Sequence, residues 1–123
     1  MAYPLSLSGL NTRAEITDTV ICACLGLDSN DKGVIRAADP DVSMSTSNTV
    51  MKGMEKIKHC FDSVSPMDTQ HLSSSIRIDV KEGADTARLT ASALGQHFRA
   101  GEGREPNTKY RLAGSIYDIQ VVK

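Results

Sequence analysis

Residues 86–99 of this chain read Thr-Ala-Arg-Leu-Thr-Ala-Ser-Ala-Leu-Gly-Gln-His-Phe-Arg. Alternate positions carry small or apolar side chains and then a histidine: Ala87, Leu89, Ala91, Ala93, Gly95 and His97. A repeat of two is typical of a β-strand with one face against a core, because successive side chains point to opposite faces of a sheet. The stretch therefore predicts a long strand whose covered face carries a histidine among small residues.

Similar alternation occurs on both sides of this strand. In residues 69–80 one parity is apolar and the other polar: Leu72, Ile76, Ile78 and Val80 against His71, Arg77 and Asp79. Residues 109–122 form a third stretch of matching length. The connecting segments Glu82–Asp85 and Gly101–Asn107 have the composition of turns. We expect three antiparallel strands in sequential order.

The first half of the chain has a helical period instead. Apolar residues recur at helical spacing at Ile16, Val20, Cys24 and Leu27. They predict a helix from about Arg13 to Leu27, with Thr12 and Glu15 as its capping box. Three shorter elements are expected after it: a helix capped by Ser29–Asp31 and ending near Ala38, a strand over 42–45, and a helix between Gly53 and Pro66. Helices followed by a meander predict an α+β fold.

Length and composition agree with one globular domain. The chain has 123 residues, of which 40% are hydrophobic and 24% charged, with a formal net charge of −1. No basic cluster indicates nucleic acid, and the longest uncharged apolar run, residues 19–27, is too short to span a bilayer. The N-terminus lacks the features of a signal peptide. We expect a flexible arm over residues 1–11, a single domain over 12–123, a cytoplasmic location, and no nucleic-acid or membrane partner.

The cysteines and glycines indicate no cofactor. Cys22, Cys24 and Cys60 have neither zinc-ligand spacing nor the pattern of a disulfide framework, so we expect thiols in a reducing compartment. The Gly101-Glu-Gly103 segment follows a strand but lacks the helix of a phosphate-binding turn. The sequence therefore predicts no metal and no other cofactor.

The histidines are the first candidates for chemistry. His59, beside Lys58 in the predicted last helix, is expected to be a solvated surface residue. His97 shares its strand face with small side chains, which either let a helix pack closely or leave room for a ligand. Both alternatives remain open here: a pocket with Ala93 and His97 in its wall, or a core histidine with satisfied partners.

Asp28 and His71 form a second candidate pair. Asp28 ends the apolar face of the first helix, where a buried carboxylate without a partner is costly. A strand histidine provides such a partner, and the carboxylate would fix the tautomer and make the imidazole a general base. The alternative is that Asp28 caps the next helix.

The remaining polar residues are weaker candidates. Ser73, Ser74 and Ser75 lack a Gly-x-Ser-x-Gly elbow and are expected to be ordinary strand residues. Tyr110 and Tyr117 on the last strand either contribute a hydroxyl to the pocket or pack within the sheet.

Several segments together resemble the SnoaL-like proteins of the nuclear transport factor 2-like superfamily, in particular the small ones common in fungi. The matching segments, within residues 12–122, are Ile16–Asp28 with the acidic residues up to Asp41, Gly53–Ile57, Met67–His71, Ala93–Gly103 and Tyr110–Tyr117. The resemblance implies a cone, in which a strongly curved antiparallel sheet wraps around the N-terminal helices and a pocket opens at one end. Members usually continue into a final strand that contains tryptophan. This chain has no tryptophan, so either it is naturally shortened or a C-terminal piece is missing, and that last strand is not expected.

The resemblance also implies roles for particular residues. In scytalone dehydratase and a dehydrochlorinase of this superfamily, an aspartate at the end of the first helix pairs with a histidine at the start of a strand. Those positions are Asp28 and His71 here, and the dehydratase's second histidine corresponds to His97. Leu27 stands where the dehydratase has a tyrosine, so scytalone itself is not the expected substrate.

Taken together, the residues and the resemblance predict a cofactor-independent lyase, isomerase or cyclase acting on a small apolar carbonyl-bearing metabolite of polyketide or terpenoid type. The expected catalytic residues are Asp28, His71 and His97, and the expected substrate-binding residues are Leu27, Ala93, Tyr110 and Tyr117. The alternative is a non-catalytic small-molecule-binding or dimerisation module of the same fold. An open sheet edge favours association, so we expect a homodimer.

Overall fold

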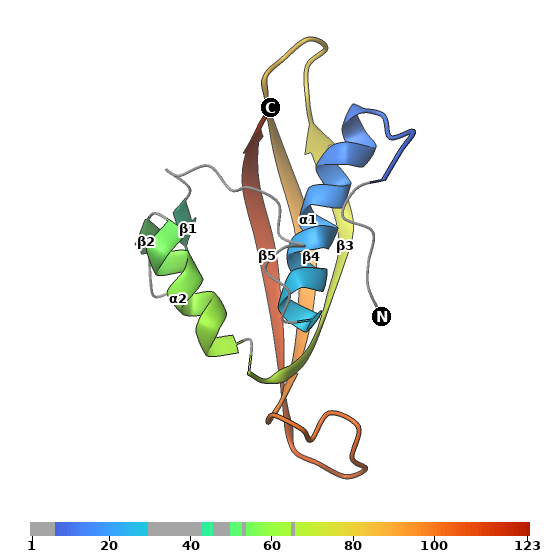
Figure 1. The fold of residues 1–123 in the computed structure, drawn as a ribbon. Helices are drawn as coiled ribbons and strands as arrows, with labels where there is room; N and C mark the ends of the chain where they lie inside the picture. Colours follow the sequence, from blue (N-terminus) through green and yellow to red (C-terminus); the bar gives the residue numbers. More distant parts are fainter. Residues whose placement is uncertain (1–6, 30–42, 46–49, 53, 65) are drawn as a thin grey trace.

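The computed structural model describes residues 7–29, 43–45, 50–52, 54–64 and 66–123. The elements in chain order are α1 (Thr12–Ser29), β1 (Ser43–Ser45), β2 (Val50–Lys52), α2 (Met54–Val64), β3 (Asp68–Asp79), β4 (Thr86–Phe98) and β5 (Tyr110–Val122). The long strands form an antiparallel sheet in the order β3-β4-β5, while β1 and β2 pair in a separate two-stranded sheet. Figure 1 shows α1 running along the large sheet. The α+β class and the predicted meander of three strands are confirmed. β5, the last of these three strands, is present as predicted over residues 109–122.

The core lies between α1 and the inner face of the sheet, which is the face that α1 covers. Ile16 and Val20 of α1 pack with Ala87, Leu89 and Ala91 of β4, and Leu89 is only 1% exposed. Partly buried side chains of β3 and β5 surround this cluster: Ile76, Ile78, Val80, Tyr117, Ile119 and Val121. The period-two pattern of β4 therefore marks its buried face as predicted.

β3 contains a β-bulge at Ser75 and Ile76, which together oppose Ala91 of β4. The pairs on either side of the bulge are Ser74 with Ser92 and Arg77 with Thr90. Ser75 has a φ of 54°, in the left-handed region that side chains other than glycine rarely adopt. An extra residue of this kind bends a strand and increases its twist.

The bulge decides which face His71 occupies. An extra residue moves all following side chains to the opposite parity, so odd-numbered residues before the bulge share the inner face with even-numbered residues after it. His71 therefore lies on the same face as Ile78, and Leu72 lies on the outer face with Arg77. The grouping of Leu72 with the core residues of this strand, opposite His71, is wrong for this reason.

The start of α1 and the region before α2 differ in detail from the sequence-based prediction. The cap of α1 is Asn11, whose Oδ1 accepts from the Ala14 N–H at 2.9 Å, so Thr12 lies within the helix and the predicted capping box is wrong. β2 was not predicted, because three residues are too few to show a period. β1 lies within the predicted strand over 42–45, and α2 within the predicted Gly53–Pro66 helix segment.

Part of the prediction lies outside the described residues. This applies to residues 1–6 of the expected arm, to the short helix expected after Ser29 and to residue 42. None of the described helices is both long and apolar enough to cross a membrane.

The left-handed conformation of Ser75 leads to a first prediction. Ser75→Val should be less stable than Ser75→Gly by about 1–2 kcal/mol, because a β-branched side chain is strained at positive φ whereas glycine adopts it freely. Urea unfolding monitored by circular dichroism measures the difference.

Ser74 is the matched control, since it is exposed and lies in regular register on the same strand. There the order should reverse, because valine favours an extended strand and glycine does not. Equal stability of the two Ser75 variants would contradict the assigned bulge.

Candidate active site

Asp28, in the last turn of α1, is bound to the beginning of β3 through both of its carboxylate oxygens. Oδ1 accepts from the Thr69 hydroxyl at 2.9 Å and from His71 Nδ1 at 2.7 Å. Oδ2 accepts from the His71 backbone N–H at 2.8 Å. The side chains of His71 and Asp28 are 10% and 19% exposed. Hydrogen bonds to a charged acceptor contribute about 1.5–3 kcal/mol each, so these contacts offset the burial of the carboxylate.

These hydrogen bonds fix the tautomer of the His71 ring. Because a carboxylate can only accept, the neutral imidazole carries its proton on Nδ1 and has its lone pair on Nε2. Two contacts to the same residue, one to the backbone and one to the ring, also fix the orientation of the side chain. The result is an imidazole whose Nε2 is available to accept a proton.

His97 of β4 lies beside His71, and Gly95 makes this approach possible. The ring centroids are 5.1 Å apart at an interplanar angle of 86°, an edge-to-face contact. A Cβ added to Gly95 would lie 2.8 Å from His97 Cε1 and 3.0 Å from His71 Cδ2. The two rings therefore occupy the space that a side chain at position 95 would need. His97 Nδ1 is buried and has no hydrogen-bond partner within the described structure.

The small residues of β4 lie along the whole of its inner face. Ala87 and Ala91 lie in the core cluster and allow α1 to pack closely. Ala93 is also buried, but it pairs with Ser73, next to the pairing of Gly95 with His71. Close packing of α1 thus accounts for the small residues at Ala87 and Ala91, whereas a pocket with Ala93 and His97 in its wall stays a prediction.

Tyr117 and Cys24 adjoin the same region of the inner face. Burial raises the pKa of the Tyr117 phenol, and the proximity of Cys24 and Asp28 raises it further. Burial also raises the pKa of the Cys24 thiol, with a smaller contribution from the charge of Asp28. Both groups therefore stay protonated at neutral pH. Cys24 was not among the predicted site residues, although its position one helical turn before Asp28 is visible in the sequence.

The other expected site residues lie as follows. Leu27 is partly buried and immediately precedes Asp28. Tyr110 is 55% exposed, and its ring contacts that of Phe98, with centroids 5.2 Å apart. Tyr110 has the parity of the exposed outer residues of β5, so the structure does not bring it to the histidines. His59 on α2 is exposed, as predicted.

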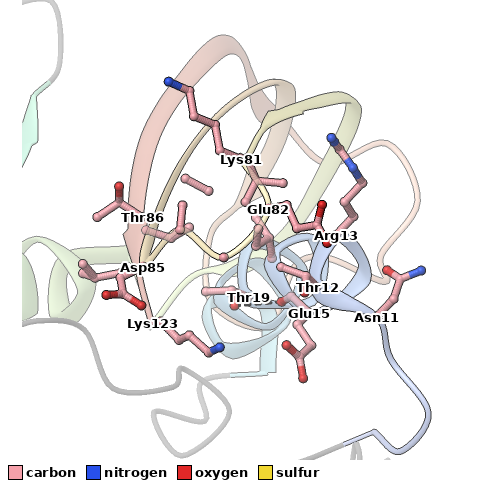
Figure 2. A pocket seen from close by; sticks show the side chains of 17 residues that line it. Asn11, Thr12, Arg13, Glu15, Thr19, Lys81, Glu82, Asp85, Thr86 and Lys123 are labelled. Carbon is pink, nitrogen blue, oxygen red and sulfur yellow. Dashed lines mark hydrogen bonds between the residues drawn. The ribbon is translucent and has the colours of Figure 1, made fainter.

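A hollow of about 540 Å³ lies at the opposite end of α1 and is separate from this site (Figure 2). The start of α1, the β3–β4 turn and the end of β5 form its walls, with Arg13, Lys81, Glu82 and Lys123 among the lining residues. Arg13 and Asp28 are 15 residues apart on one helix, which corresponds to about 22 Å. The polar residues of this hollow therefore do not reach the histidines.

No metal site is evident in the described part of the chain. There, no group of three or more His, Cys, Asp or Glu side chains is arranged to hold a metal ion. The carboxylate of Asp28 and the imidazoles of His71 and His97 are groups that can accept and donate protons.

The described chain thus has one long helix against a three-stranded antiparallel meander, with a carboxylate and two histidines near the end of that helix. The model of the SnoaL-like domain family matches residues 8–123, and the chain belongs to this family. A relative from Penicillium crustosum, named terrestric acid biosynthesis cluster protein E, is 33% identical over 125 residues. The match covers 99% of this chain and 80% of that protein.

Solved structures agree on the fold. A hexachlorocyclohexane dehydrochlorinase (type 2) matches with a TM-score of 0.73 at 20% identity, over 91% of this chain and 75% of its own. A nuclear transport factor 2-like superfamily protein from Salmonella enterica serovar Typhimurium matches with a TM-score of 0.70 at 14% identity, over 89% and 78% of the two chains. The expected family and fold are thereby confirmed.

Gly95 provides a test of the site geometry. Gly95→Ala should separate the two imidazoles, because the new methyl group would overlap His97 Cε1. We expect nuclear Overhauser contacts between the ring protons of His71 and His97 to weaken or disappear.

Gly114→Ala is the matched control, because no atom lies within 4 Å of the added Cβ. This variant should retain the contacts between the rings. Unchanged ring contacts in folded Gly95→Ala would show that the imidazoles do not meet over Gly95.

Proposed function

We propose that this protein is a cofactor-independent lyase, isomerase or cyclase that removes a proton next to a carbonyl group of a small, mostly apolar metabolite. The observation that carries the proposal is the pair of bonds from His71 to Asp28, through Nδ1 and the backbone N–H. They orient an imidazole base beside a second histidine. A histidine acts as a general base only when its ring is held in a fixed orientation within reach of the proton that it removes.

In the proposed reaction, His71 Nε2 takes a proton from the carbon adjacent to the carbonyl. The electron pair of the broken C–H bond moves toward the carbonyl oxygen and forms an enolate, while Asp28 stabilises the imidazolium. His97 donates a hydrogen bond or proton to the developing oxyanion. If the enolate then expels a leaving group from the next carbon, the protein is a lyase. If the enolate is reprotonated at another position it is an isomerase, and if the enolate attacks a second carbonyl group of the same molecule it is a cyclase.

Three further residues are proposed to contact the substrate. Leu27 and Ala93 would supply apolar surface on either side of the histidines. Tyr117 would supply a phenolic O–H, since its raised pKa keeps it protonated and able to donate. Tyr110 is not retained in this role, because it contacts Phe98 on the other face of the sheet.

The setting that we propose is secondary metabolism. The relative from P. crustosum is named for the biosynthetic cluster of terrestric acid, and it matches nearly the whole of this chain. A polyketide- or terpenoid-like substrate is consistent with that relationship. The remaining alternative is a module of the same fold that binds a small molecule without turnover.

Proton exchange tests the reaction without knowledge of the substrate. In D₂O the protein should accelerate exchange of the protons adjacent to the carbonyl of benzylacetone, acetophenone or cyclohexanone, followed by proton NMR. His71→Ala should reduce the acceleration by about a hundredfold or more, the usual contribution of a general base. Asp28→Asn should reduce it less, because the imidazole remains but loses its fixed tautomer.

His59→Ala is the control, since His59 is exposed on α2 and outside the site. It should leave the exchange rate unchanged. Equal rates for the wild-type protein and His71→Ala, or no acceleration with any of the three ketones, would favour the binding module.

We also propose that two copies associate through the outer face of the sheet. Four large aliphatic side chains form an outer apolar patch there: Leu72, Leu94, Leu112 and Ile116, exposed by 56%, 41%, 57% and 83%. Leu72 pairs with Leu94 across the strands, so the patch is continuous rather than scattered. The Arg88–Asp118 ion pair on the same face presents both signs of charge, which suits a self-complementary two-fold contact.

Light scattering after gel filtration tests this association. The wild-type protein should have twice the 13.2 kDa mass of the chain, and Ile116→Asp should have the mass of a single chain. Val122→Asp, at the end of the same strand beyond the patch and the ion pair, is the matched control and should remain dimeric. A wild-type monomer at micromolar concentration would contradict the proposal.

A further inference from the structure

Ser73 carries a buried hydroxyl group that the described part of the protein does not use. Its Oγ is buried and has no hydrogen-bond partner there. The two preceding inner-face residues of β3 differ in this respect, since Thr69 and His71 both bond to Asp28. A buried hydroxyl without a partner is destabilising, and alanine would occupy the position without that penalty.

The position of Ser73 places this hydroxyl next to the proposed reacting groups. Ser73 lies two residues after His71 on the same face of β3, which is about 6.6 Å along a strand. Its partner across the strands is Ala93, and the next pair on this face is His71 with Gly95, so the β4 residue paired with each of them is small.

His97 supplies an independent observation on the other side of His71. Its Nδ1 is likewise buried and lacks a partner within the described structure. Among the described residues, Ser73 Oγ and His97 Nδ1 are the only buried side-chain atoms found without a hydrogen-bond partner. They lie on the same face of the sheet, since Ser73 is two residues after His71 on β3 and His97 is two residues after Gly95 on β4. Buried polar groups are normally satisfied, and two unsatisfied groups beside one imidazole point to a molecule that satisfies them.

We propose that the Ser73 hydroxyl is a substrate-binding group. It holds an oxygen function of the substrate on the side of the reacting carbon that is remote from the carbonyl, while His97 holds the carbonyl oxygen. The substrate therefore carries two oxygen functions, one on each side of the carbon that His71 deprotonates. The assignment of that carbon rests on the proposed function, whereas the contact with Ser73 does not.

Two probes that differ by one hydroxyl group test this contact. The probes are benzylacetone and the same ketone with a hydroxyl on its benzylic carbon, and their affinities are measured by NMR titration of the labelled protein. The wild-type protein should bind the hydroxylated ketone roughly fivefold to tenfold more tightly, the effect of one net hydrogen bond. Ser73→Ala should bind the two ketones equally.

Ser74→Ala is the matched control, because Ser74 is the next residue of β3 but is exposed on the outer face. It should keep the preference of the wild-type protein. A preference that survives in Ser73→Ala, or a wild-type protein that binds the two ketones equally or binds neither, would overturn the proposal.

The stability of the unliganded protein provides a second measurement. Ser73→Ala should melt at the wild-type temperature or above it, because it removes an unsatisfied polar group. A fall of more than about 4 °C would overturn the proposal by showing that the hydroxyl has a structural partner.

His71→Ala separates this inference from the proposed function. The variant should lose proton exchange but keep the preference for the hydroxylated ketone. If the wild-type protein shows the preference but no exchange, the contact with Ser73 stands and the proposed reaction fails.

Discussion

The carboxylate of Asp28 holds the end of α1 to the start of β3, and the polar half of the inner face depends on this contact. It accepts three hydrogen bonds from Thr69 and His71, two residues that are remote from it in the sequence. A partly buried carboxylate without these donors would be strongly destabilising. The same bonds that satisfy its charge also orient the His71 ring. Structural stability and the presentation of a base are therefore coupled at one residue.

The bulge in β3 divides the inner face into two zones. Before it, this strand contributes polar side chains at Thr69, His71 and Ser73. From Ile76 of the bulge onward it contributes apolar side chains, at Ile76 and Ile78. Without an extra residue, strict alternation would put these two sets on opposite faces of the sheet. The left-handed conformation at Ser75 is thus the local strain that allows one strand to contribute to both the core and the candidate site.

The candidate site retains features that a purely structural domain would have little reason to keep. Gly95 leaves space that two imidazoles fill, and His97 and Ser73 keep buried polar atoms without partners. Each of these features lowers the stability of the unliganded protein. Such local violations of packing and hydrogen-bonding rules are typical of functional sites, which are compensated elsewhere in the fold. Here the compensation comes from the core around Leu89 and the bonds of Asp28.

The sequence alone determined the order of the long helix and the three long strands, and the buried face of β4, because burial on one side imposes a visible period. It also singled out Asp28 and His97, since charged and titratable groups are conspicuous on apolar or small-residue faces, and it offered His71 as a strand histidine that could be the partner of Asp28. The tertiary structure decided the face of His71, because nothing in a run of serines marks a bulge. It also decided that two imidazoles meet over Gly95, since strand register and twist bring remote residues together. Only the structure shows that Ser73 Oγ and His97 Nδ1 are buried without hydrogen-bond partners, because their neighbours in space are remote in the sequence.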